Sequence, residues 1–140
     1  MWMMGRMILS LGLLAYGAVR VFGAVMFLLV GAGMIDSPEF EAGRQILFDA
    51  LPDMNEGAFI AFSPFAYTLF SGAMGAAMTL GALGTFFKRL WGVWLLALYN
   101  LLFLAMFVNF AVVNTKLIHL AVTIILTILL YYLVRKRRRI

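Results

Sequence analysis

The sequence contains no cysteine and only one histidine, His119. Without cysteine, the chain forms no disulfide, binds no metal through thiolates and carries no Cys-x-x-Cys redox pair. A single imidazole excludes a His-ligated metal site within one chain and a haem held by two histidines. We therefore expect no metal site and no resident cofactor.

Acidic residues are absent from most of the chain, because all six lie between positions 36 and 56. Only 12% of the residues are charged and 65% are hydrophobic, whereas an average globular protein has roughly 25% charged residues. A soluble domain needs charges along its whole surface, so this distribution predicts a single integral membrane domain over residues 1–140. The six acidic residues are Asp36, Glu39, Glu41, Asp49, Asp53 and Glu56.

Four stretches are long and apolar enough to cross a bilayer, which takes about 20 residues. The first stretch exceeds the hydrophobic region of a signal peptide, so we interpret it as a retained span. Ser63 and Pro64 are typical of an N-cap and a first helical residue, and they predict the start of the second span. The expected fold is an all-α bundle of four transmembrane helices at about 7–35, 64–87, 90–113 and 117–134.

The loop 36–62 between the first two spans is predicted to contain an amphipathic helix. Pro38 is typical of a helix start, and Leu51-Pro52 predicts the end of the helix. Such a helix lies on the membrane surface, and the alternative is an ordinary solvated connector. The apolar residues 58–62 are expected to dip toward the bilayer. The apolar positions of the predicted helix are Phe40, Ile46, Leu47, Ala50 and Leu51.

The distribution of lysine and arginine predicts the orientation, because cytoplasmic flanks are enriched in both. Arg6, Lys88, Arg89 and the basic residues of the tail 135–140 would share one side, whereas Arg44 and Lys116 would lie on the other. Both termini are therefore expected in the cytoplasm and the acidic loop outside. The tail is expected to contact anionic lipid headgroups and not nucleic acid. Its basic residues are Arg135, Lys136, Arg137, Arg138 and Arg139.

Arg20 lies about 20 Å into the first predicted span, near the middle of the bilayer. A central arginine costs about 2.5–3.5 kcal/mol on insertion scales, and the sequence offers no acidic residue at that depth. Such a cation is either a site for an anion or a polar headgroup, such as a quinone carbonyl or a lipid phosphate, or a structural hydrogen-bonding hub. The predicted intramembrane polar cluster comprises Arg20, Asn100, Tyr16, Tyr67 and Ser71, with Thr123 as a further neutral partner.

Small residues recur every four positions in the second span, at Ala73, Ala77 and Gly81. Small residues let helix backbones approach closely within a membrane. This face is predicted to pack inside the bundle or, alternatively, to form a homodimer seam. His119, near the outer end of the fourth span, is expected to be a hydrogen-bonded polar tip.

Several segments follow the same order as in a known family. Arg20 precedes a glycine-studded run that ends at Gly33, a polar stretch with proline and phenylalanine occupies 36–40, and Leu51-Pro52 follows. Residues 81–89, Gly-Ala-Leu-Gly-Thr-Phe-Phe-Lys-Arg, close a glycine-rich second span. This order resembles the DoxX-like family of small four-helix membrane proteins.

The resemblance implies an accessory subunit of a membrane redox system, beside a quinone-linked oxidoreductase. Two positions differ from the family pattern, because 65–75 contains no acidic residue and Met34-Ile35 stand where lysine is usual. The predicted function is a non-catalytic anchor or accessory subunit, in the bacterial inner membrane, with other membrane subunits as partners. The alternative is a small oligomeric transporter or channel that passes an anion or a polar solute by Arg20.

Overall fold

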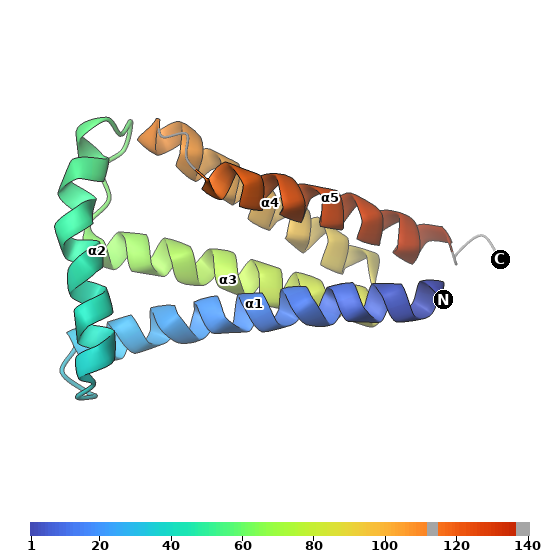
Figure 1. Ribbon diagram of the computed structural model, residues 1–140, viewed down its shortest axis with the longest axis horizontal. Helices are drawn as coiled ribbons and strands as arrows, with labels where there is room; N and C mark the ends of the chain where they lie inside the picture. The colour runs from blue at the N-terminus through green and yellow to red at the C-terminus, as the bar shows by residue number, and fades with distance from the viewer. Residues whose placement is uncertain (112–114, 137–140) are drawn as a thin grey trace.

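Five helices make up the part of the chain that the computed structural model describes, residues 1–111 and 115–136 (Figure 1). The all-helical prediction is confirmed. Four of the helices, α1, α3, α4 and α5, are long and apolar enough to cross a membrane, by length and composition. The helices are α1 (Trp2–Gly31), α2 (Pro38–Glu56), α3 (Pro64–Phe86), α4 (Leu90–Phe110) and α5 (Lys116–Arg135).

The helix boundaries follow local chain chemistry. Ser63 caps α3 as expected, since its Oγ accepts a hydrogen bond from the backbone nitrogen of Ala66 at 3.1 Å. Lys88 adopts a φ of 60° in the turn between α3 and α4. The first helix begins at Trp2 and ends at Gly31, earlier at both ends than predicted. Part of the connection between the third and fourth predicted spans, residues 112–114, lies outside the described residues.

Helix α3 is the centre of the fold because glycines bring its backbone against both α1 and α4. A Cβ on Gly75 would lie 2.9 Å from the Cβ of Arg20 in α1, and one on Gly84 would lie 2.6 Å from the Cα of Gly92 in α4. A Cβ on Gly81 would lie 2.9 Å from the carbonyl oxygen of Gly92. At these three glycines there is space for a hydrogen atom but not for a side-chain carbon.

The predicted small-residue face of α3 divides between two environments. Ala77 is buried in the hydrophobic core, and Gly81 is buried against α4. Ala73 is exposed on the surface of the chain. The contact with α1 instead runs through Gly72 and Gly75, which are not among the predicted positions.

Helix α2 lies across one end of the other helices, and both chain termini lie at the opposite end (Figure 1). Its inward side carries Phe40, which contacts the rings of Phe22 and Phe27 in α1. Leu51, with 2% of its surface exposed, is its buried anchor. Ile46, predicted on the apolar side, is 70% exposed.

The prediction that α2 ends at Leu51-Pro52 is wrong, because the helix continues through Pro52 to Glu56. Side-chain hydrogen bonds fix the additional turn. Asn55 Nδ2 donates to the carbonyl oxygen of Phe62 at 2.9 Å, and Asn55 Oδ1 accepts from the nitrogen of Phe62 at 3.0 Å. This pairing with the following loop offsets the backbone hydrogen bond that proline removes.

The segment after α2 is tied to the end of α4 by Asn109. Asn109 Oδ1 accepts from the backbone nitrogen of Ile60 at 2.8 Å, and Asn109 Nδ2 donates to the carbonyl oxygen of Ile60 at 3.0 Å. The backbone nitrogen of Phe59 donates to the carbonyl oxygen of Asn109 at 3.0 Å. Helix α2 is therefore fixed to α1 at its start and to α4 beyond its end.

A buried cation closes the end of the fold that holds the termini. Arg6, with 5% of its surface exposed, donates to the carbonyl oxygen of Thr85 at 2.6 Å and to that of Phe86. The hydroxyl groups of Ser10 and Thr85 lie 2.8 Å apart. Because the C-terminus of a helix carries partial negative charge, a guanidinium at the end of α3 is favourable.

We predict that Gly92→Ala lowers the free energy of unfolding by about 1–3 kcal/mol, as expected of an overpacked contact. A Cβ at this position would lie 2.5 Å from the backbone nitrogen of Thr85, so the two helices must separate. Gly12→Ala is the matched control because nothing lies within 4 Å of the added carbon. Reversible unfolding in detergent measures both variants, and equal stabilities would contradict the tight α3–α4 contact.

Candidate functional site

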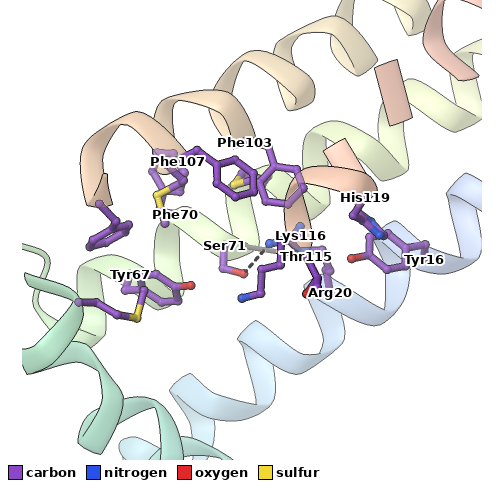
Figure 2. Close-up of a pocket in the computed structure, with 14 residues that line it drawn as sticks. Tyr16, Arg20, Tyr67, Phe70, Ser71, Phe103, Phe107, Thr115, Lys116 and His119 are labelled. Carbon is purple, nitrogen blue, oxygen red and sulfur yellow. Dashed lines mark hydrogen bonds between the residues drawn. The ribbon is translucent and has the colours of Figure 1, made fainter. Parts of the chain in front are cut away.

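A cavity of about 550 Å³ lies near the end of the fold that α2 covers (Figure 2). This volume lies within the range of small-molecule sites. All five helices contribute to its wall, with aromatic, methionine, hydroxyl and basic side chains. The lining residues are Tyr16, Arg20, Met54, Tyr67, Phe70, Ser71, Met74, Phe103, Met106, Phe107, Phe110, Thr115, Lys116 and His119.

Arg20 is held in the cavity wall by contacts with α3 and α4. One guanidinium nitrogen donates to the hydroxyl of Tyr99 at 3.0 Å, and the other donates to Ser71 Oγ at 3.4 Å. The guanidinium carbon lies 5.8 Å and 5.9 Å from the ring centroids of Tyr99 and Phe103. Within about 6 Å, an aromatic face stabilises a cation. Arg20 is therefore oriented by neutral groups.

The structure brings together most of the predicted polar cluster. Tyr16, Tyr67 and Ser71 line the same cavity as Arg20. Asn100 lies apart from them, since its Nδ2 donates to Thr127 Oγ1 at 2.8 Å in the seam between α4 and α5. Its Oδ1 is buried with no hydrogen-bond partner among the described residues.

The proposed contact of Thr123 with Arg20 is replaced by a local one. Thr123 Oγ1 donates to the carbonyl oxygen of Leu120 at 2.9 Å, and Thr127 Oγ1 donates to the carbonyl oxygen of Thr123 at 2.7 Å. The polar groups of α5 therefore serve its own backbone and its seam with α4.

Two residues important for the cavity were missed by the sequence analysis. Tyr99, fully buried beside the predicted Asn100, is the closest hydrogen-bonding partner of Arg20. Lys116, interpreted as a flanking cation, lines the cavity at the start of α5. Tyr99 and Asn100 are adjacent polar residues in a predicted span, and this pair was the available signal. The sequence does not show which of the two residues faces α1.

Positive charge dominates the polar side of the cavity. Arg20 and Lys116 both extend into the space between α1, α3 and α5 (Figure 2). None of the described residues that line the cavity is acidic. Opposite charges attract, so an anionic group that contacted both side chains would be stabilised.

His119 lines the cavity beside Tyr16, and their ring centroids lie 4.9 Å apart. Its Nε2 is buried and has no hydrogen-bond partner among the described residues. The expected hydrogen bond at the tip of the His119 side chain is therefore not formed by Nε2 with any described residue. A buried polar atom without a partner carries a desolvation cost, which a bound acceptor or donor would remove.

The other wall of the cavity is apolar. It is formed by Met54 of α2, Phe70 of α3 and Met106, Phe107 and Phe110 of α4. Methionine and phenylalanine adapt to irregular apolar ligands. The arrangement fits a molecule with an apolar body and a polar or anionic head. Within residues 1–111 and 115–136, no three His, Cys, Asp or Glu side chains gather as they would around a metal ion.

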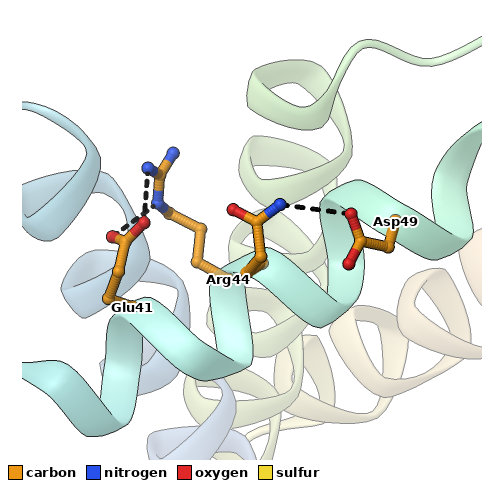
Figure 3. A network of polar contacts seen from close by, with 4 residues as sticks. Glu41, Arg44 and Asp49 are labelled. Carbon is orange, nitrogen blue, oxygen red and sulfur yellow. Dashed lines mark hydrogen bonds and ion pairs between the residues drawn. The ribbon is translucent and has the colours of Figure 1, made fainter.

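The acidic side chains of α2 do not line the cavity. Glu39, Asp49, Asp53 and Glu56 are exposed. Glu41 instead pairs with Arg44, with 3.0 Å between Glu41 Oε1 and an Arg44 guanidinium nitrogen, and Figure 3 shows this pair. The exposed surface of α2 therefore carries net negative charge.

The end with the termini is basic. Lys136 Nζ lies 4.6 Å from the ring of Trp2, which joins the end of the described chain to its start. Arg135 donates to the hydroxyl of Tyr131 one turn earlier. The predicted lipid contacts of residues 137–139 lie outside the described residues.

We predict that Tyr99→Phe lowers the free energy of unfolding by about 1.5–3 kcal/mol, since a hydrogen bond to a charged group is lost. The ring and its packing are retained, so the change tests the hydroxyl alone. Tyr132→Phe is the control, because Tyr132 is 64% exposed. Detergent unfolding of both variants is the measurement, and an unchanged Tyr99→Phe protein would show that Arg20 does not depend on this hydroxyl.

Comparison with known proteins identifies no relative of the chain. No family model, no curated protein and no solved structure matches it. The resemblance based on residue order therefore stays a prediction, and the function is argued from the cavity and from the distribution of charge.

Proposed function

We propose that the protein is a non-catalytic, multi-pass membrane subunit that binds the head of an amphiphilic molecule, such as a quinone or a lipid, in the cavity at Arg20. The observation that carries this proposal is that Arg20, hydrogen-bonded to Tyr99, and an apolar wall line one cavity. The resemblance to the DoxX-like family favours a place beside a quinone-linked oxidoreductase. The subunit would shape the site and leave electron transfer to its partner.

The chemistry of the lining supports a binding role and not an enzymatic one. Acyl transfer, glycoside hydrolysis and proton abstraction need a nucleophile with an adjacent base, or paired carboxylates. The described lining offers hydroxyls, two cations and one imidazole, and it includes no carboxylate. Tyr99 and Ser71 are occupied in holding Arg20. These groups are suited to recognition.

The distribution of charge supports an orientation with both termini in the cytoplasm. Arg6, Lys88, Arg89 and the start of the basic tail lie at one end of the helices, and the acidic α2 crosses the other end (Figure 1). Lysine and arginine in short flanks favour the cytoplasmic side. Helix α2 would then lie at the outer surface, above a four-helix membrane bundle. A bacterial inner membrane is the expected host.

A transporter or channel is the second candidate, favoured by the two cations that line one cavity. An open path would have to continue past Arg20 to the end with the termini. The core between them is packed, with Met78, Ala82, Tyr99 and Leu130 fully buried and the hydroxyl groups of Ser10 and Thr85 in contact beyond. This packing favours the binding role.

The orientation is tested by single-cysteine labelling, which the cysteine-free sequence makes clean. An impermeant maleimide is expected to label Asp49→Cys in intact cells, because Asp49 lies on the exposed face of α2. Arg89→Cys, in the turn between α3 and α4, is expected to react only after the membrane is opened. The opposite pattern would overturn the proposed orientation.

The subunit role is tested by purification of the full chain from its native membrane in a mild detergent. We expect it to leave the membrane in stoichiometric association with larger membrane proteins. Arg20→Ala is expected to keep this association and to lose bound amphiphile, measured by mass spectrometry of the extracted complex. Lys88→Ala, at the opposite end, is the control that should lose neither. A lone chain without bound amphiphile would refute the proposal.

A clean homo-oligomer would support the second candidate instead. In that case, liposomes that contain the purified protein should pass a permeant anion, and Arg20→Ala should abolish the flux. Flux unaffected by Arg20→Ala would reject the transporter as well.

A further inference from the structure

We infer that the ligand of the Arg20 cavity is a molecule dissolved in the bilayer, which enters sideways between α1 and α5 and parts the rings of Tyr16 and His119 as it passes. This inference rests on the proposed function, and it adds the phase from which the ligand comes and the route that it takes. The ligand class is restricted to molecules whose apolar part holds them in the membrane, so molecules that arrive from water are excluded.

The exposed part of the cavity wall lies on α1 and at the start of α5. The described lining residues that are exposed are Tyr16, Thr115 and Lys116. In contrast, Met74 of α3 and Phe110 of α4 are buried, and the other lining residues are half-buried. The cavity therefore has its closed side against α3 and α4 and its open side between α1 and α5.

Aromatic contacts close the end of the cavity that α2 covers. The ring centroid of Phe62, in the loop after α2, lies 5.7 Å from that of Phe70 and 5.8 Å from that of Phe110. The ring of Tyr67 lies 6.5 Å from that of Phe62 and completes this cluster. At the start of α2, Phe40 contacts two rings of α1. A ligand that entered past α2 would have to break these contacts.

The contact between α1 and α5 at the opening is a contact between two rings. The centroids of Tyr16 and His119 lie 4.9 Å apart, and both side chains line the cavity (Figure 2). His119 Nε2 has no hydrogen-bond partner among the described residues, so no hydrogen bond at this atom has to break when the rings part. Because a neutral imidazole nitrogen is either a donor or an acceptor, Nε2 can form a hydrogen bond with a passing polar head.

The packing of α1 against α3 is much tighter than its contact with α5. A Cβ on Gly17 would lie 2.8 Å from the backbone nitrogen of Thr79 in α3. Helix α5 contains no glycine between Lys116 and Arg135, so its contacts are made through side chains. Side chains change rotamer more readily than packed backbones separate. The seam between α1 and α5 is therefore the part of the wall that opens most easily.

The surroundings of the opening are apolar. Tyr16 lies near the middle of α1, a helix long and apolar enough to cross a membrane. Val19, one turn after Tyr16, is exposed, and so are Ile118 and Val122 on either side of His119 in the sequence. Exposed apolar surface of this kind is typical of contact with a membrane. The opening therefore faces lipid, and an amphiphile reaches it without leaving the bilayer.

The test joins the two sides of the opening, which the cysteine-free sequence makes clean. Tyr16→Cys and His119→Cys are combined in the full chain, in nanodiscs of zwitterionic lipid, and bridged with a short bifunctional methanethiosulfonate. The probe is hexadecanol with a photoreactive diazirine in its chain, and mass spectrometry locates the label after illumination. A bridge formed before the probe is added is expected to prevent labelling of Met106 and Phe107 in the cavity wall. A bridge formed after loading is expected to retain the probe during a wash with probe-free vesicles.

Matched controls separate the route from the chemical modification. The same double variant treated with a monofunctional methanethiosulfonate carries both changes without a bridge, and it should load and release the probe. A bridge between Phe22→Cys and Phe40→Cys joins α1 to α2, whose rings lie 5.8 Å apart at these positions, and it should leave loading unchanged. Label on Leu101, which is exposed on α4, should be the same in every sample.

A second measurement needs no bridge and remains informative if the paired cysteine variant fails to fold. Tyr16→Ala removes one ring of the pair, and loading of the probe is expected to be about two- to tenfold faster, as the loss of one aromatic contact predicts. Phe22→Ala, which removes another exposed ring of α1, should leave the rate unchanged.

The outcomes separate this inference from the proposed function. Cavity label that persists when the bridge between positions 16 and 119 is formed first would overturn the lateral route, as would an unchanged loading rate in Tyr16→Ala. Loss of label with the bridge between positions 22 and 40 would place the entrance at α2 and overturn it too. Each of these results would leave the amphiphile-binding subunit intact. An unmodified chain whose cavity is labelled neither by this probe nor by the matching hexadecanoate would reject the proposed function and the route together.

Discussion

The charge of Arg20 within an apolar set of helices is the constraint on which the rest of the site depends. A guanidinium in that setting is tolerated only where neighbours supply acceptors and aromatic faces. Tyr99, Ser71 and Phe103 do so from α3 and α4. The close contact at Gly75 brings α1 near enough for these interactions. The close packing of α1 against α3 therefore also places Arg20 beside the groups that hold it in the cavity wall.

Helix α2 completes the site from the end. It brings Met54 to the cavity, and its hydrogen bonds through Asn55 and the loop to Asn109 fix its position relative to α4. Its acidic side chains do not line the cavity. A helix predicted to lie on the membrane surface thus also contributes Met54 to the cavity wall.

Much of the fold could be predicted from the sequence, because span length and the Ser63-Pro64 start depend on local chemistry. Three of the predicted neighbours of Arg20, namely Tyr16, Tyr67 and Ser71, line its cavity. The choice of Tyr99 over Asn100 could not be predicted, since hydropathy in a uniformly apolar helix does not define its rotation. The exposure of Ala73 could not be predicted for the same reason. The continuation of α2 through Pro52 is accompanied by hydrogen bonds between Asn55 and Phe62 in the following loop, which helix start and stop signals do not include.

The glycine contacts along α3 also limit how this sequence can diverge. At Gly84 and Gly92 any side chain would meet backbone atoms, whereas Gly5, Gly12 and Gly23 have open space around the missing carbon. Sequences that descend from this chain should therefore retain glycine at positions 84 and 92. At positions 5, 12 and 23 they should accept alanine or larger residues. Such unequal tolerance would give distant relatives a recognisable glycine spacing even after their hydrophobic residues have been exchanged.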